Sequence, residues 1–180
     1  MSSSQSETND IILETSLQAF FYDQLHEVNK KNLNPLPNES VYYSSLIMDH
    51  FGESQKYFEV EEGKVREKIL GTKLLESSGK PRPVQKRMLR DIGDTALFMC
   101  GYFSDSVNKK LIDLSYYHEL GRIAYRRLNS YIPELYDYPE FYDLLSDRFQ
   151  HLAEMIYLVS KQNEGLNTDD AFLIVDRKTA

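Results

Sequence analysis

The sequence contains a single cysteine, Cys100, and no apolar run long enough to span a bilayer. One cysteine forms no intramolecular disulfide, and no metal site can be assembled from cysteines. The first ten residues, MSSSQSETND, are polar and precede no apolar segment, so we expect no secretory signal peptide. These absences predict a cytoplasmic protein without a membrane segment.

Signatures of familiar catalytic and cofactor sites are also missing. The phosphate loop GxxxxGK[ST], the dinucleotide fingerprint GxGxxG, the nucleophile elbow GxSxG and the zinc motif HExxH are all absent. The four histidines, at positions 26, 50, 118 and 151, do not complete the paired Glu-x-x-His motifs of a di-iron bundle. We therefore assign no catalytic residue, no metal ion and no cofactor from the sequence.

Acidic residues outnumber basic ones, 28 to 21, which gives a formal net charge of -7. Binding to nucleic acid depends on neutralising phosphates, so this balance argues against nucleic acid as a general partner. A length of 180 residues suits one domain with a substantial core. We expect a disordered N-terminus over residues 1–8, a helical domain over residues 9–165 and a C-terminal tail over residues 166–180.

Residues 88–103, MLRDIGDTALFMCGYF, form the segment around which we expect the chain to be organised. Its first half is amphipathic at helical spacing, and its second half, from Ala96 on, is apolar nearly all round. A helix without a polar face must be covered on every side by other elements. Gly93 and Gly101 lower helix stability, so each predicts a close approach of another segment or a helix end.

The remaining chain predicts further helices and no strand-rich region. Apolar spacing and caps place them at about residues 10–31, 39–51, 63–76, 113–131 and 134–163, the last with a kink at Pro139. Gly121 and Ala124 form a small-residue face that permits close helix packing. Residues 53–62 leave a helical turn and a short extended piece equally open. The predicted fold is all-α: a single-domain bundle of five or six helices around a central buried helix.

Asp94 is the candidate for a buried functional carboxylate. It lies one turn before the apolar half of the central helix and shares a face with Asp91. A buried carboxylate needs a partner, and Arg122, Arg126 or a tyrosine hydroxyl can supply one. Acid–base chemistry with a raised pKa is one interpretation, and a structural network that ties helices together is the other, which we favour.

Five positive charges occur in eleven residues before the first acid, Asp91. They flank the expected start of the central helix, which itself attracts anions, and they are Lys80, Arg82, Lys86, Arg87 and Arg90. A solvated surface accounts for them, as does a binding site for an acidic protein, a phosphate or a nucleotide. Arg122, with Arg126 and Arg127, adds to an anion site only if it falls on the same side.

Residues 131–143, YIPELYDYPEFYD, interleave tyrosines with acidic residues. Tyrosine is enriched in protein interfaces, so this segment predicts either a docking surface or a loop whose rings fold over the core. Cys100 has no neighbour in sequence that lowers its pKa, which indicates buried packing rather than a nucleophile.

Residues 90–106, RDIGDTALFMCGYFSDS, followed by residues 111–128, LIDLSYYHELGRIAYRRL, resemble a pattern found in uncharacterised proteobacterial proteins. In that pattern a Gly-Asp pair opens an apolar helix, Gly-Tyr-Phe ends it, and a Tyr-Tyr pair opens the next. The resemblance covers about a fifth of the chain. It implies a helical framework and no activity, with these residues as the framework: Gly93, Asp94, Gly101, Tyr102, Phe103, Asp113, Tyr116, Tyr117, Gly121, Ala124 and Tyr125.

Three functions are compatible with these features. The leading hypothesis is a non-enzymatic interaction or regulatory adaptor that binds an acidic protein partner, with a homodimer as a further option. The alternative is a sensor of a small anion or nucleotide at the basic helix start. The third is an enzyme around Asp94, Tyr116, Tyr117 and His118. The candidate binding residues are Lys80, Arg82, Lys86, Arg87, Arg90, Asp94, Tyr116, Tyr117 and Arg122.

Overall fold

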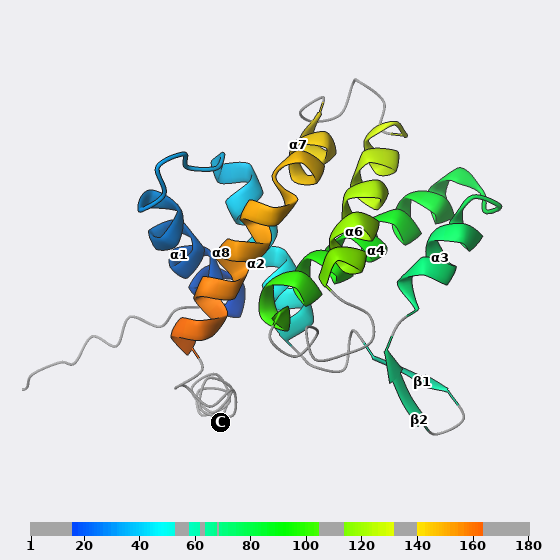
Figure 1. The fold of residues 1–180 in the computed structure, drawn as a ribbon, viewed down its shortest axis with the longest axis horizontal. Helices are drawn as coiled ribbons and strands as arrows, with labels where there is room; N and C mark the ends of the chain where they lie inside the picture. The colour runs from blue at the N-terminus through cyan, green and yellow to red at the C-terminus, as the bar shows by residue number, and fades with distance from the viewer. Residues whose placement is uncertain are drawn as a thin grey trace, which may run out of the picture.

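The computed structural model describes residues 16–52, 58–61, 64–67, 69–104, 114–131 and 140–163. In these ranges seven helices pack together, and a two-stranded hairpin projects away from them (Figure 1). The all-α fold is therefore confirmed. The expectations of a disordered start over residues 1–8 and of a tail over residues 166–180 lie outside the described residues.

The central helix is α4, Arg82–Tyr102. It begins before the segment 88–103 that the sequence singles out, and Pro83 occupies its first turn, where the missing N–H of proline costs nothing. Every residue from Thr95 to Gly101 is buried, and Leu97 has no exposed surface. Helices α2, α3, α6 and α8 all contact α4. The apolar half is thus enclosed by the rest of the chain, as its composition predicts.

Glycines let two neighbouring helices approach α4 closely. A Cβ atom at Gly101 would lie 2.6 Å from the Ile156 side chain and 3.0 Å from the Ala153 carbonyl oxygen, both on α8, Phe149–Asn163. A Cβ atom at Gly121, on α6, Leu114–Asn129, would meet the ring of Phe149 and the Ala96 methyl group. The predicted close approaches are confirmed at both positions.

Helices α1, Leu17–Lys30, and α2, Asn38–Gly52, form a pair at one end of the molecule. The Ser16 hydroxyl caps α1 by accepting from the Ala19 amide at 3.1 Å, whereas the start expected at about residue 10 lies outside the described residues. Asn29 fixes the connection, since its side chain accepts from the Leu36 amide at 2.8 Å and donates to the Leu36 carbonyl at 2.9 Å.

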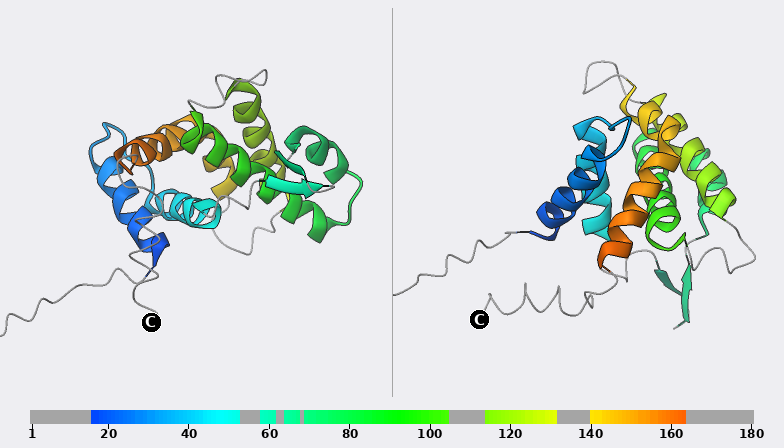
Figure 2. Two further views of the ribbon diagram at one scale, coloured as in Figure 1. Left: turned by 90° about the horizontal axis from the view of Figure 1, so that it is seen from below. Right: turned by 60° about the vertical axis from the view of Figure 1, so that its left-hand side comes forward.

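The segment after α2 corrects the expectation of a helix over residues 63–76. Strands β1, Phe58–Glu61, and β2, Lys64–Glu67, pair antiparallel, and only α3, Leu70–Ser77, is helical. The register pairs Phe58 with Glu67 and Glu61 with Lys64. Figure 2 shows the hairpin standing outside the helical body.

The predicted last helix, residues 134–163, is divided, and the described residues form seven helices where five or six were expected. Helix α7, Phe141–Asp147, is separated from α8 by the single residue Arg148. Before α7, Glu140 has a φ of 83°, in the left-handed region that non-glycine residues rarely adopt. The expected kink at Pro139 lies outside the described residues. No helix in the described ranges combines the length and the hydrophobicity that crossing a membrane requires.

Candidate functional site

The basic residues before Asp91 gather around the start of α4. Arg82, Lys86 and Arg90 follow one another at four-residue intervals and so share one side of the helix. The Arg82 guanidinium carbon lies 5.8 Å from the centre of the Tyr131 ring, at the end of α6. The Arg90 guanidinium carbon lies 6.0 Å from the centre of the Tyr142 ring on α7. Both arginines are exposed, and a tyrosine ring holds each in place.

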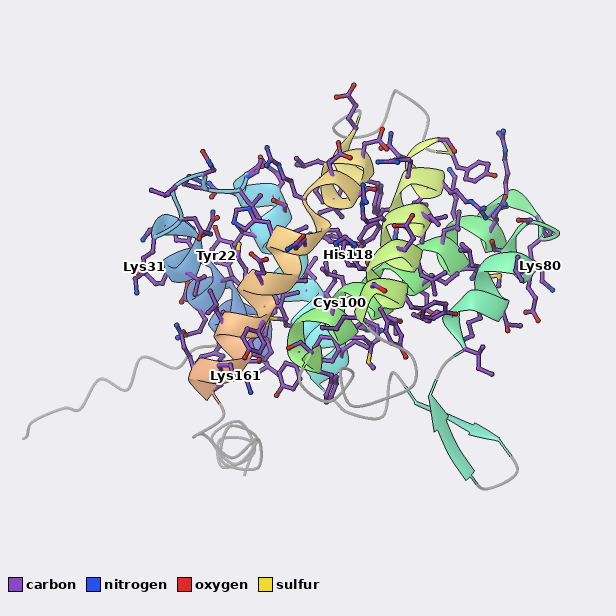
Figure 3. All side chains as sticks on the ribbon, viewed as in Figure 1. Tyr22, Lys31, Lys80, Cys100, His118 and Lys161 are labelled. Atoms are coloured by element: carbon purple, nitrogen blue, oxygen red, sulfur yellow. The ribbon has the colours of Figure 1, made fainter. Side chains whose placement is uncertain are left out.

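The other three cations of this group remain available to a partner. In the described ranges no carboxylate forms an ion pair with Lys80, Lys86 or Arg87, and Lys80 and Arg87 are exposed. Figure 3 places Lys80 at the edge of the molecule. We call the five residues Lys80, Arg82, Lys86, Arg87 and Arg90 the basic surface.

The backbone of the helix start contributes little to this surface. The capping position is Pro81, which provides no side-chain hydrogen bond, and Pro83 has no N–H. The amides of Val84 and Gln85 both donate to the Pro81 carbonyl at 2.9 Å. Few amides therefore remain for an anion, and the charge of the basic surface comes from its side chains.

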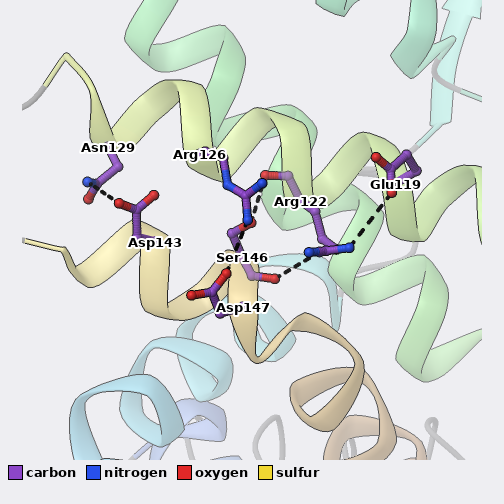
Figure 4. Close-up of polar contacts among 7 residues, drawn as sticks. All are labelled: Glu119, Arg122, Arg126, Asn129, Asp143, Ser146 and Asp147. Carbon is purple, nitrogen blue, oxygen red and sulfur yellow. Dashed lines mark hydrogen bonds and ion pairs between the residues drawn. The ribbon is translucent and has the colours of Figure 1, made fainter.

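Arg122 lies in a different contact, between α6 and α7 (Figure 4). Its Nε donates to the Ser146 carbonyl at 3.2 Å, and the Ser146 hydroxyl donates back to the Arg122 carbonyl at 3.1 Å. Arg126 pairs with Asp147 at 3.1 Å. Two members of the second basic group, Arg122 and Arg126, thus contact α7, and Arg122 joins two helices instead of extending the basic surface.

Asp94 accepts hydrogen bonds from two tyrosines on different helices. The hydroxyls of Tyr43, on α2, and Tyr125, on α6, both donate to its Oδ1 atom at 2.8 Å. Of the partners that the sequence offers, a tyrosine hydroxyl is the one that the structure uses. A Cβ atom at Gly93 would lie 2.5 Å from the Tyr125 ring, so the glycine before Asp94 makes room for that ring.

Burial governs the electrostatics of this network. Asp94 keeps part of its surface exposed, yet its carboxyl group lies deep, and burial raises its pKa to about 7. The tyrosine hydrogen bonds and the charge of Arg90 lower the pKa, but their effect is smaller than that of burial. The charge of Asp91 adds to the increase. Burial and the adjacent carboxylate raise the pKa of both tyrosines, so the hydroxyls remain protonated donors.

Aromatic rings surround the network and connect it to α7. The Tyr43 ring makes edge contacts with Phe141 at 5.4 Å and Tyr142 at 6.1 Å between ring centres, and Tyr125 lies 5.9 Å from Tyr142. Sequence reasoning did not single out Tyr43 as a partner. The neighbouring residue, Tyr42, is 51% exposed.

The residues of the enzyme hypothesis are not assembled around Asp94. Tyr117 is buried, and Tyr116 is 39% exposed with its hydroxyl against Gly71 on α3. His118 lines a pocket that includes neither Asp94 nor either of these tyrosines. Among the described residues, no three His, Cys, Asp or Glu side chains are grouped so that they could hold a metal ion.

Comparison with known proteins adds no further constraint. No protein family, curated protein or solved structure matches this chain. The function must therefore be argued from the residues alone.

Proposed function

We propose that this chain is a helical interaction module that binds an acidic protein partner through the basic surface. The observation that carries the proposal is that, among the described residues, no carboxylate pairs with Lys80, Lys86 or Arg87 at the start of α4. On a chain with a net charge of -7, such a local cluster of one sign is a feature that an oppositely charged partner can recognise. Complementary charge accelerates association and selects among partners.

The packing of α4 supports this proposal. Tyr131 and Tyr142 hold Arg82 and Arg90 against the fold, so two of the five cations are already positioned. Ordering these side chains in advance reduces the entropy that association must remove. Of the acidic aromatic segment over residues 131–143, positions 132–139 lie outside the described residues, so its expected role in docking stays a prediction, as does a homodimer.

A sensor of a small anion or nucleotide is the competing function. The start of α4 supports this function less than it supports protein binding, because Pro81 and Pro83 leave few amides to surround a phosphate. A thermal-shift series with inorganic phosphate and ATP separates the two functions. Binding would raise the melting temperature as ligand concentration increases, and a rise that depends on the basic surface would favour the sensor.

The experiment is a cross-linked pull-down with the full chain. The variant Lys86→Glu/Arg87→Glu reverses two neighbouring cations of the basic surface, and we expect it to reduce capture of acidic proteins by about tenfold. Raising the salt concentration should weaken wild-type capture as well, since exposed charges are screened.

The matched control is Lys30→Glu/Lys31→Glu, which makes the same change in net charge at the end of α1. Figure 3 places Lys31 on the opposite side of the molecule from Lys80. Capture should survive in this control. Equal recovery from wild type and from both variants would contradict the proposal, and equal loss from both would show that overall charge alone is responsible.

A further inference from the structure

A pocket of about 400 Å³ opens where α4, α6 and α8 converge. Figure 3 labels two of its residues, Cys100 and His118, near the centre of the molecule. Leu114, Ala153 and the ring of Tyr157 contribute to walls that are mostly apolar. A volume of this size is typical of sites for small molecules. None of its residues belongs to the basic surface or to the Asp94 network.

In the described part of the chain, the lining of this pocket contains one acidic residue, Glu154, and no lysine or arginine. Burial, together with the charge of Arg122, lowers the pKa of His118 and so favours the neutral imidazole. The Glu154 carboxylate is exposed and accepts a hydrogen bond from Gln150 at 3.0 Å, which leaves further acceptor capacity. The pocket therefore disfavours an anion and favours a cation.

Two further polar atoms at this site lack partners in the described part of the chain. The hydroxyl oxygen of Ser104 and the Nε2 atom of His118 are both buried without a hydrogen bond. A buried polar group left unpaired is costly, and both groups can act as acceptors. Neither atom has exposed surface in the empty pocket, so each side chain must turn toward an occupant to bind it.

The thiol of Cys100 does not provide covalent chemistry here. It is buried and lies 3.8 Å from the Leu114 carbonyl, and burial raises its pKa to about 12. A thiol in this state is neither a nucleophile nor a metal ligand at neutral pH. The pocket is accordingly a site for reversible binding.

We infer that this pocket binds a small amphiphilic amine, whose apolar body lies against Ala153 and Leu114 and whose ammonium group is held by Glu154. The ammonium group carries three N–H donors, which suit one carboxylate and the two unpaired acceptors. This site is independent of the proposed protein-binding function, because it uses the other end of α4.

Three probes with the same phenyl body and different polar groups test the inference: 2-phenylethylamine, 2-phenylethanol and 3-phenylpropanoate. Titrations of the full chain are followed by nuclear magnetic resonance through the Ala153 methyl signal. The amine should bind most tightly, the alcohol about three- to fivefold more weakly, as expected for one exposed ion pair, and the acid most weakly. An alcohol or an acid that binds as tightly as the amine would overturn the inference.

The variant Glu154→Gln locates the ammonium group. It should weaken the binding of the amine about three- to fivefold and leave the affinity for the alcohol unchanged. Because Glu154 is exposed, the fold should tolerate the change. Glu119→Gln removes an exposed carboxylate of α6 that does not line the pocket, and amine affinity should not change. An amine affinity that is the same in wild type and in Glu154→Gln would refute the assignment.

Discussion

Replacing Asp94 with asparagine should stabilise the protein at alkaline pH and not at acidic pH. The amide oxygen of an asparagine can still accept from the hydroxyls of Tyr43 and Tyr125, so both hydrogen bonds remain. What the substitution removes is the ability to ionise. The difference between wild type and Asp94→Asn therefore isolates the cost of a charge at this position.

The magnitude follows from the shift in pKa. The pKa of Asp94 is about 7 in the folded protein and 3.8 for an unperturbed aspartate, a difference of about 3 units. Each unit corresponds to about 1.4 kcal/mol, so the full penalty is about 4 kcal/mol. Between these two pKa values the folded state retains a proton that the unfolded state has lost. Wild-type stability from this group is therefore present below about pH 4 and falls as pH rises to 7.

Urea unfolding followed by circular dichroism at pH 4, 6 and 8 measures the effect. The two proteins should differ by no more than about 1 kcal/mol at pH 4. At pH 8 Asp94→Asn should be more stable by up to about 4 kcal/mol. Other carboxylates titrate in both proteins, so their contribution cancels in the difference.

A second variant, Tyr43→Phe, should change the stability at alkaline pH in the opposite direction. Tyr43→Phe removes one donor from the carboxylate and keeps the ring, so it should destabilise the protein by about 1–3 kcal/mol at pH 8 and by less at pH 4. If Asp94→Asn were instead less stable than wild type at pH 8, the carboxylate would be a net stabilising group. The argument from burial would then be wrong.

Two further predictions concern packing and helix contacts. Gly101→Ala should lower the free energy of unfolding in urea by about 1–3 kcal/mol, because its methyl group would meet Ile156. The control is Gly79→Ala, where the nearest atom to an added Cβ is 3.9 Å away, and its stability should change by less than about 0.5 kcal/mol. Equal effects would contradict the close packing of α4 on α8. Arg126→Ala removes an exposed ion pair, so it should lower the free energy of unfolding by less than about 1 kcal/mol, and by less still in high salt. Arg122→Ala removes a hydrogen bond to the carbonyl of the buried residue Ser146, so it should lower the free energy of unfolding by about 1–3 kcal/mol at any salt concentration.

The central helix was predictable because its evidence is local. Seven consecutive buried residues, 95–101, contain no charged side chain, and a segment of that kind must be enclosed wherever the chain places it. The small-residue face at Gly121 was predictable for a similar reason, since a residue without a side chain marks a place where something else fits. In both cases the residue types alone indicate that another segment must pack closely against this one.

The partners of Asp94 could be predicted by type and not by position. A buried carboxylate needs donors, but Tyr43 lies 51 residues away and Tyr125 31 residues away in the chain. To predict which of Tyr42 and Tyr43 faces Asp94, one must know the rotation of α2 about its own axis to within one residue. Packing against α4 and α7 fixes that rotation, and the apolar spacing of α2 does not reveal it.

The sequence left an extended piece open over residues 53–62 but did not identify the hairpin, for a different reason. Strands β1 and β2 have four residues each, too few for alternation to be distinguished from a helical turn. The division between α7 and α8 at Arg148 is likewise invisible in the apolar spacing, since the interruption is a single residue and the next helix resumes at once. Short elements and short interruptions carry too little sequence to identify them.

Arg90 links the core network to the basic surface. Its guanidinium lowers the pKa of Asp94, and it is also one of the five cations of the basic surface at the start of α4. An acidic group seated against Arg90 would offset that effect, so a charge change at the surface alters the ionisation of the core. A variant of Arg90 would therefore disturb both sites at once. Lys86→Glu/Arg87→Glu leaves Arg90 and its contact with Tyr142 in place, and for that reason it tests the surface separately from the stability of the fold.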